Sequence, residues 1–331
     1  MPELAVVLIT KNQAWNVPRL IESVLRHTSS AASREIVLVD SASSDATVEL
    51  ACNYPIRVLQ LSPDQRLTAA AGRYTGYKHT SGDIVLFLDG DNELCPGWLD
   101  AAMEVLRCND DIAAVAGQIV DLPRSAQHHD PPPDNGASGD IQITDVRHGG
   151  GAVAYKRSVL EQVGTFNPYI YSDEEPELCI RIRHAGYRVV KINRCSVYHY
   201  TDPSEKLSTL IGRWKRNLYV GSGQNIRFHA RTGLLWPYVK ERGHGLVPGV
   251  GLIAGLAALM CSLLFRQPIW FILWVAAVFA AIVAYAIRNR SIYRTVHSLL
   301  KRMLILHGTI KGFLLEPMEP DSYPAKVVVI K

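Results

Sequence analysis

The fold of this chain is decided by the stretch Ser81-Gly82-Asp83-Ile84-Val85-Leu86-Phe87-Leu88-Asp89-Gly90-Asp91-Asn92. Five consecutive apolar residues stop at two aspartates, a pattern typical of a buried parallel strand that ends in an exposed turn. In open α/β sheets, ligands bind at the carboxyl ends of the strands. Asp89 and Asp91 offer the oxygen ligands that Mg2+ or Mn2+ prefers. An Asp-x-Asp pair also occurs by chance, so other segments have to support this site.

The first 120 residues alternate between apolar, strand-like runs and helical patterns. Strands are expected at residues 4–9, 36–39, 57–61, 84–88 and 112–120, with helices between them. This order predicts a parallel α/β sheet. Acidic residues close two of these strands, Asp40 one of them and Asp89 another.

The regular pattern breaks between residues 121 and 148, where Pro, Asp, Gly and Ser dominate. We expect a mobile surface loop here. The adjacent His128, His129 and Asp130 are possible metal ligands, but without a partner cluster nearby a solvated loop fits them better.

Four acidic residues gather at the start of a helix that ends near Gly186: Asp173, Glu174, Glu175 and Glu177. Acids at a helix N-terminus complement the helix dipole. Four of them within five positions repel one another and exceed what capping requires, which favours a chemical role.

Two runs of 20 residues, 246–265 and 268–287, contain no charged side chain. A helix of that length spans about 30 Å, the thickness of a bilayer's hydrocarbon core. We therefore expect two transmembrane helices within residues 246–287. Basic residues flank their outer ends, in a juxtamembrane segment over 226–245 and again after 287. The positive-inside rule then makes the chain an integral membrane protein whose N-terminal part faces the cytoplasm. Residues 288–331 are expected to form an amphipathic interfacial helix and a polar tail.

Charge and cysteine content narrow the class of protein. The net charge of +4 is too small to indicate a nucleic-acid partner. No C-x-x-C pair is present, and reduced thiols in a cytoplasmic domain fit the six cysteines better than a disulfide framework or a zinc site: Cys52, Cys95, Cys108, Cys179, Cys195 and Cys261.

Several segments resemble, in order, the inverting nucleotide-sugar glycosyltransferases of family 2, which have the GT-A fold. The resemblance covers about residues 4–200 and rests on the segments Val7–Asn12, Val37–Asp40, Ser43–Thr47, Ala71-Gly72-Arg73, Gly82–Asp91, Gly164-Thr165-Phe166 and Leu178–Ile182. It implies an α/β catalytic domain over residues 1–225, Rossmann-like with a mainly parallel sheet. Residues 1–120 would be its nucleotide-sugar-binding half, 121–148 the mobile loop and 149–225 the acceptor half.

The resemblance also implies where the nucleotide sugar binds. Asp40 would accept hydrogen bonds from the base of the donor, with Thr10 and Asn12 beside it. Arg73 would approach the nucleotide or its diphosphate, because a guanidinium fork fits phosphate oxygens.

A divalent cation, Mg2+ or Mn2+, is implied at the carboxylates of the opening stretch. Asp89 and Asp91 would hold it on the diphosphate and so neutralise the leaving group. His199 stands where relatives often have a histidine that helps bind the metal or diphosphate, although a structural role fits a lone histidine equally well.

An inverting transferase needs one further group, a base that deprotonates the acceptor hydroxyl. The family's Glu-Asp-x-Asp-Leu motif matches Glu174-Glu175-Pro176-Glu177-Leu178, which makes Glu175 the candidate base. A longer Glu replaces the usual Asp here, so Asp173 and Glu174 stay open as alternatives.

Gly212-Arg213-Trp214 matches half of the Gln-x-x-Arg-Trp signature of processive polysaccharide synthases. Leu210 occupies the Gln position, and two transmembrane helices are too few to build a translocation channel. Addition of a single sugar is therefore the better interpretation. Arg213 and Trp214 are expected to bind the acceptor, although a solvated interfacial helix explains them equally well.

Together these features predict a membrane-anchored inverting glycosyltransferase that transfers one sugar from a nucleotide-sugar donor to a lipid-linked or other membrane-associated acceptor. One alternative is a subunit of a processive polysaccharide synthase. Another is a non-catalytic membrane scaffold that keeps the fold.

Overall fold

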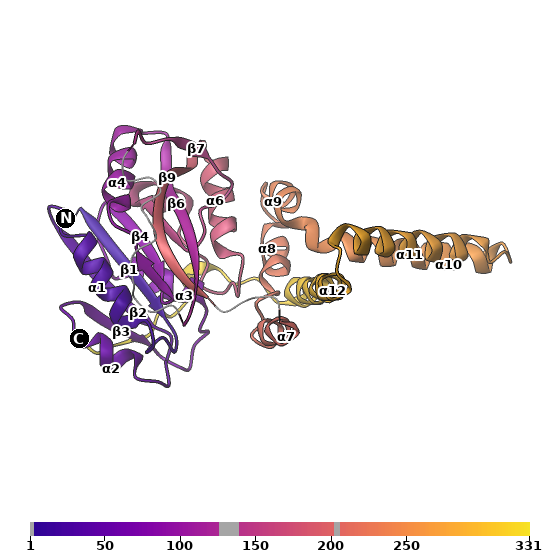
Figure 1. The fold of residues 1–331 in the computed structure, drawn as a ribbon, viewed down its shortest axis with the longest axis horizontal. Helices are drawn as coiled ribbons and strands as arrows, with labels where there is room; N and C mark the ends of the chain where they lie inside the picture. Colours follow the sequence, from indigo (N-terminus) through magenta and orange to yellow (C-terminus); the bar gives the residue numbers. More distant parts are fainter. Residues whose placement is uncertain (1–2, 126–138, 202–205) are drawn as a thin grey trace. The chain divides into compact units, whose positions relative to one another are not determined.

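The computed structural model describes residues 3–125, 139–201 and 206–331 (Figure 1). The chain divides into two compact units. The sheet unit contains residues 1–202 and 318–331, and the helical unit contains residues 203–317. The boundary expected at residue 225 is therefore wrong. Helices α7 (Leu207–Lys215) and α8 (Gly221–His229) pack with the later helices of the helical unit, to which they belong.

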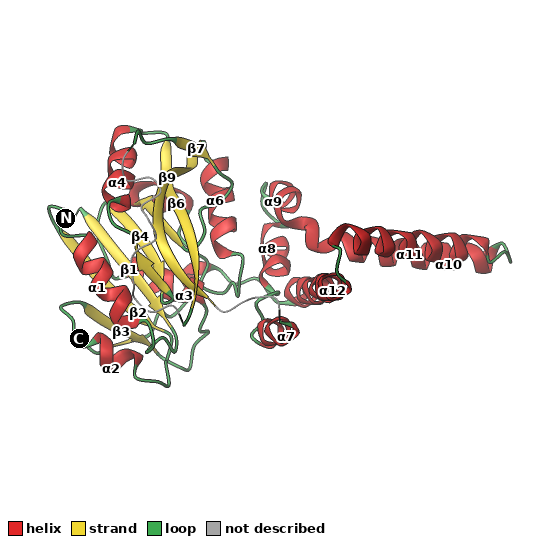
Figure 2. Cartoon of the chain, in the orientation of Figure 1, coloured by secondary structure: helices red, strands yellow, loops and turns green. Residues whose placement is uncertain are grey.

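Ten strands of the described residues form a single mixed sheet, drawn in yellow in Figure 2. Four neighbouring strands are parallel, in the order β3 (Arg57–Leu61), β2 (Arg34–Asp40), β1 (Leu4–Thr10) and β4 (Ile84–Asp89). The sheet continues as β8 (Ala152–Lys156), β6 (Ile112–Pro123), β9 (Arg188–Thr201) and β5 (Asn92–Leu94). Strand β8 runs antiparallel to both β4 and β6. The expectation of parallel strands is thus confirmed for the first four.

Helices cover both faces of the sheet, which explains why its central strands are apolar without interruption. Along β1, alternate residues enter two separate cores. One core contains Leu4, Val6 and Leu8 with helices α1 (Val17–His27), α2 (Thr47–Ala51) and α4 (Trp98–Cys108). The other contains Ala5, Val7 and Ile9 with helices α3 (Ala69–Lys78), α5 (Arg157–Val163) and α6 (Glu174–His184).

The region expected to be a mobile loop, residues 121–148, contains regular structure at both ends. Strand β6 continues to Pro123, paired with β9, and β7 (Ile143–Asp145) also pairs with β9. The prediction of a loop is wrong for these residues, because β9 is 14 residues long and offers pairing partners on both sides. The possible metal ligands His128, His129 and Asp130 lie outside the described residues.

Cys95 and Cys195 form a disulfide that links the end of β5 to β9. The expectation of six reduced thiols is therefore wrong for this pair. The two residues are 100 positions apart, and they meet because β5 lies antiparallel on β9, with Leu94 opposite Val197. The other four cysteines are free thiols: Cys52, Cys108, Cys179 and Cys261.

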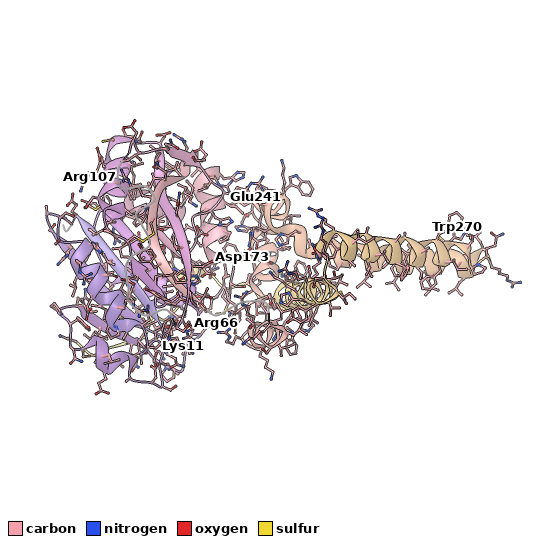
Figure 3. All side chains as sticks on the ribbon, viewed as in Figure 1. Lys11, Arg66, Arg107, Asp173, Glu241 and Trp270 are labelled. Carbon is pink, nitrogen blue, oxygen red and sulfur yellow. A yellow bond between two sulfur atoms is a disulfide. The ribbon has the colours of Figure 1, made fainter. Side chains whose placement is uncertain are left out.

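The helical unit carries an apolar hairpin, formed by α10 (Val247–Leu264) and α11 (Ile269–Asn289). Trp270, labelled in Figure 3, lies near its tip. The two helices touch at Gly255, where a Cβ atom would meet the ring of Trp274, and the Trp274 indole N–H donates to the Gly251 carbonyl at 3.2 Å. Most other side chains of the hairpin are exposed, although they are apolar. By length and composition, both helices could cross a membrane.

The helix expected to be amphipathic and interfacial is α12 (Ile292–Leu314), and it packs against α8 through small residues. A Cβ atom on Gly308 or Gly312 would meet the backbone of residues 219–220, and one on Gly223 would meet the Thr309 carbonyl. The two backbones therefore approach each other closely. The remaining helices of this unit are α9 (Leu235–Arg242) and the short 3-10 helix η1 (Gly243–Leu246).

Residues 318–331, expected to be a polar tail, are part of the sheet unit. After a short 3-10 turn, η2 (Pro320–Ser322), strand β10 (Val327–Val329) pairs antiparallel with the edge strand β3. Tyr323 is buried between Tyr74 and Tyr169, and its hydroxyl donates to the Arg66 carbonyl at 2.7 Å. The tail is thus structured, because one aromatic anchor and one strand edge hold it.

Candidate active site

Strands β1, β2 and β4 bring the predicted nucleotide-binding residues to one edge of the sheet. Their register places Thr10 opposite Asp40 and Ile9 opposite Asp89. The edge is the carboxyl end of all three strands, where open α/β sheets bind ligands. Asp40 and Asp89 therefore lie at the same edge of the sheet.

Asp40 is fully buried and anchors the turn that follows β2. Its carboxylate accepts hydrogen bonds from Thr10 Oγ1 at 3.2 Å, from the Ser43 N–H at 2.7 Å and from Gln60 Nε2 at 3.2 Å. Asn12, with a left-handed φ of 54°, accepts from the Ser44 N–H at 2.9 Å. These bonds hold Thr10, Asn12 and Asp40 together in a single polar cluster.

Arg73 joins the strand that carries Asp89 to the helix that carries the acidic motif. It is presented by α3 and is only 5 % exposed. Its Nη2 lies 2.5 Å from Asp89 Oδ1, and its Nη1 lies 2.6 Å from Glu174 Oε1. The guanidinium is therefore neutralised by two carboxylates. A diphosphate bound here would compete with them for its N–H groups.

His199 on β9 lies between two carboxylates. Its Nε2 is 3.4 Å from Asp91 Oδ2, and its Nδ1 is 2.7 Å from Asp121 Oδ1. The hydrogen bond to Asp91, helped by Asp121, raises the pKa of His199 to about 9. The imidazole is thus positively charged at neutral pH while no metal competes for it.

The donor set at this edge suits a hard cation that arrives with its substrate. Among the described residues, no three His, Cys, Asp or Glu side chains converge as ligands for one ion, and Asp89 is paired with Arg73. Mg2+ and similar ions commonly use one or two carboxylates together with substrate phosphates. Asn92 adds a buried side-chain N–H2 group that has no hydrogen-bond partner within the described ranges. Gly151 leaves space here, since a Cβ atom would lie 2.7 Å from Asp89 Oδ2.

The acidic motif at the start of α6 separates into residues with different partners. Glu174 is paired with Arg73. Glu177 is buried and forms a two-bond ion pair with Arg181, at 2.7 and 2.8 Å, which is a structural role. Asp173, labelled in Figure 3, precedes the helix with a left-handed φ of 66°.

Glu175 is buried, and among the described residues no Lys or Arg side chain lies within hydrogen-bond distance of it. Its Oε1 accepts from the Gly149 N–H at 2.7 Å and from Cys179 Sγ at 3.2 Å, and its Oε2 lies 3.7 Å from His148 Nδ1. Burial raises the pKa of Glu175, although the Gly149 bond opposes that effect. A carboxylate with a raised pKa is suited to accept a proton near neutral pH.

Arg213 and Trp214 lie on α7, in the helical unit. The Trp214 indole N–H donates to His307 Nδ1 of α12 at 3.0 Å, and the two rings are tilted against each other. This contact helps to hold α7 on α12. Acceptor binding by Arg213 and Trp214 stays a prediction.

Sequence reasoning missed four residues of this site: Asn92, Asp121, His148 and Gly149. Asn92 directly follows Asp91 and could have been found from that position. The sequence pattern places Asp121 and His148 in a surface loop. Only the pairing of β6 with β9, which puts Asp121 opposite His199, brings Asp121 to the site.

Comparison with known proteins supports the geometry. Residues 5–164 match the model of the glycosyl transferase family 2. These residues form a family 2 glycosyltransferase domain. The chain is 24% identical over 252 residues to glycosyltransferase AglE of Haloferax volcanii, covering 68% of this chain and 73% of AglE. It is 30% identical over 115 residues to a dolichol-phosphate mannosyltransferase of Pyrococcus furiosus, covering 34% of this chain and 32% of that protein.

A solved structure has the same fold. The mannosyltransferase PcManGT from Pyrobaculum calidifontis, in complex with GDP-Man and Mn2+, superimposes with a TM-score of 0.60 at 21% identity, covering 95% of this chain and 87% of that one. The GT-A fold class is thereby confirmed.

Proposed function

We propose that this glycosyltransferase transfers one sugar from a nucleotide-sugar donor, with inversion, to a lipid-linked or other membrane-associated acceptor. The observation that carries the proposal is the separation of two acidic groups at one sheet edge. Asp89 and Asp91 lie at the end of β4, whereas Glu175 lies on α6 with a raised pKa and an oxygen left for a substrate. One group suits the leaving diphosphate and the other suits the attacking hydroxyl.

Each residue then has a defined role in the reaction. The Asp40 cluster and Arg73 bind and orient the nucleotide. A divalent cation, when bound at Asp89 and Asp91, would neutralise charge on the leaving nucleoside diphosphate; Mn2+ is present in the PcManGT complex. Glu175 takes the proton of the acceptor hydroxyl as the oxygen attacks the anomeric carbon, and the bond from that carbon to the diphosphate breaks on the opposite face. Glu174 holds Arg73 in place.

The apolar hairpin supports the choice of acceptor and location. Two helices that expose apolar side chains on most of their surface suit a bilayer, and a soluble acceptor would not require them. We infer that α10 and α11 span a membrane, with Arg213 and Trp214 close to its surface. Arginines at the base of the hairpin favour a cytoplasmic catalytic unit. The Cys95–Cys195 disulfide removes the cysteine argument for a reducing compartment, so the orientation rests on these charges.

Two alternative functions predict different results in an assay. A subunit of a processive polysaccharide synthase would yield long chains, and a non-catalytic scaffold would bind no donor. The intact set of Asp89, Asp91, Arg73 and Glu175 favours catalysis over a scaffold.

The test uses the full chain in detergent. A thermal-shift screen of UDP, GDP and dTDP sugars, with and without Mn2+, should identify one donor that raises the melting temperature. That donor should then be hydrolysed or transferred to a lipid-linked acceptor, giving a product with inverted anomeric configuration by NMR. Stabilisation by no nucleotide sugar would refute the enzyme, and products of many sugars would favour the synthase.

A further inference from the structure

We propose that Cys179 is a positioning residue for the base: its S–H group, together with the Gly149 N–H, holds one oxygen of Glu175 so that the other oxygen faces the acceptor. This inference rests on the proposed function, because it assigns Glu175 the role of base. Cys179 lies four residues after Glu175 on α6, a spacing that puts both side chains on one face of the helix.

Both donors bind the same oxygen. Gly149 N–H lies 2.7 Å from Glu175 Oε1, and Cys179 Sγ lies 3.2 Å from that atom. The second oxygen, Oε2, is left toward His148, whose half-exposed side chain is 3.7 Å away. An oxygen that already accepts two hydrogen bonds is the poorer proton acceptor, so Oε2 is the atom that takes the acceptor proton.

The thiol can act only as a donor at working pH. Cys179 is completely buried, and burial together with the neighbouring Glu175 raises the pKa of the thiol well above its ordinary range. It therefore stays protonated and uncharged. Tyr155, whose buried hydroxyl has no hydrogen-bond partner among the described residues, lies close by, and burial and Cys179 raise its pKa too.

A thiol suits this position better than a hydroxyl for a physical reason. A hydrogen bond to a carboxylate favours the charged form and lowers its pKa, which makes the carboxylate a weaker base. Since S–H is a weak donor, Cys179 can fix the rotamer of Glu175 at little cost in basicity. Glu175 is one methylene longer than aspartate. Cys179, one turn later on α6, thus holds its carboxylate in a fixed orientation.

The test compares Cys179→Ser, which keeps a donor, with Cys179→Val, which fills the volume without one. We expect Cys179→Val to lower kcat by about tenfold, the upper end for loss of one ordinary hydrogen bond, with the KM for the donor unchanged. The acidic limb of the kcat–pH profile should move to higher pH. With Cys179→Ser, kcat at pH 8 should stay within about threefold of wild type, because one positioning hydrogen bond is kept, and the acidic limb should move to lower pH. His148, Arg73 and Tyr155, the other groups that face Glu175, are the same in every variant.

Three controls make the result decisive. Cys108→Ala removes an exposed free thiol on α4 and should match wild type. Wild-type turnover measured in parallel tests the proposed function itself, so its absence would refute that function rather than the role of Cys179. Cys179→Val in a Glu175→Gln background should cause no further loss. Equal kcat values and pH profiles for the Ser, Val and wild-type proteins would overturn the inference, and so would a Val variant that folds no less stably yet loses only donor affinity. If the Val variant does not fold, the Ser variant decides through the direction of its pH shift.

Discussion

Arg73 carries a full charge and is 5 % exposed, whereas Phe279 carries none and is 67 % exposed. The first belongs to the sheet edge, where charged groups are buried and have to pair with one another. The second belongs to the hairpin, where apolar groups are exposed and have to be covered by something else. Both regions depart from the usual distribution of residues, in opposite directions. The buried charges at the sheet edge indicate a functional site. The exposed apolar side chains of the hairpin indicate that an apolar phase surrounds them.

The strongest test of the site at the sheet edge is to remove a carboxylate that contributes little to folding. Asp91→Ala should reduce metal-dependent donor turnover roughly a thousandfold, because the loss of one preorganised electrostatic contact to a developing charge has effects of this order. Asp91 is partly exposed, so the melting temperature should fall only by the small contribution of its ion pair with His199. Steady-state kinetics at saturating Mn2+ would measure the effect, with the exposed Asp64→Ala as a matched control. Wild-type rates would remove this carboxylate from the mechanism.

The hairpin can be tested by placing a charge where the surface is most apolar. Phe279→Arg puts a guanidinium near the middle of α11, and insertion scales give a cost of roughly 3 kcal/mol for that change at the centre of a spanning helix. Membrane insertion should therefore fall by about two orders of magnitude. Flotation of the protein with liposomes after cell-free synthesis would measure it. Phe279→Leu should insert normally, and an arginine variant that floats equally well would show that the helix does not span the bilayer.

The smallest expected effect is a pH dependence of stability at the sheet edge. His199 has a pKa of about 9 in the folded protein and an ordinary value of 6.5. Because the folded value is the higher one, the ion pairs with Asp91 and Asp121 stabilise the fold fully below pH 6.5 and lose their contribution as the pH rises through 9. In EDTA, the melting temperature should therefore fall between pH 6.5 and 9. His199→Gln should flatten this slope relative to wild type, and an unchanged slope would contradict the assigned pairing.

The sequence predicted features that depend on neighbouring residues. The buried strand 84–89, its terminal aspartates and the two apolar helices follow from continuous apolar runs, and all of them form as expected. Features that depend on strand register were not predicted from the sequence. Asp121 reaches His199, and Cys95 reaches Cys195, only because β6 and β5 pair with β9, with register shifts along β6 that no local pattern shows.

The two glutamates at the start of α6 show a further limit. Glu174 and Glu175 are adjacent residues of the same type, and the sequence left both open as the base. Long-range partners distinguish them, since Arg73 comes from α3 and the Gly149 N–H from the loop before β8. The tail was missed for another reason: the apolar residues 327–330 follow a polar, proline-containing segment, so the pattern predicts a polar tail throughout. Tyr323 anchors the tail through contacts with residues far away in the chain.

Strand β10 also imposes an order on biosynthesis. It covers the edge of β3, but the ribosome makes it only after the helices of the helical unit, so the nascent sheet carries an open strand edge for as long as the hairpin is being made. Unpaired edges invite pairing with other chains. The sheet edge is therefore covered only once the hairpin is complete. A chain that stops within α10 or α11 exposes an edge that chaperones and proteases can bind.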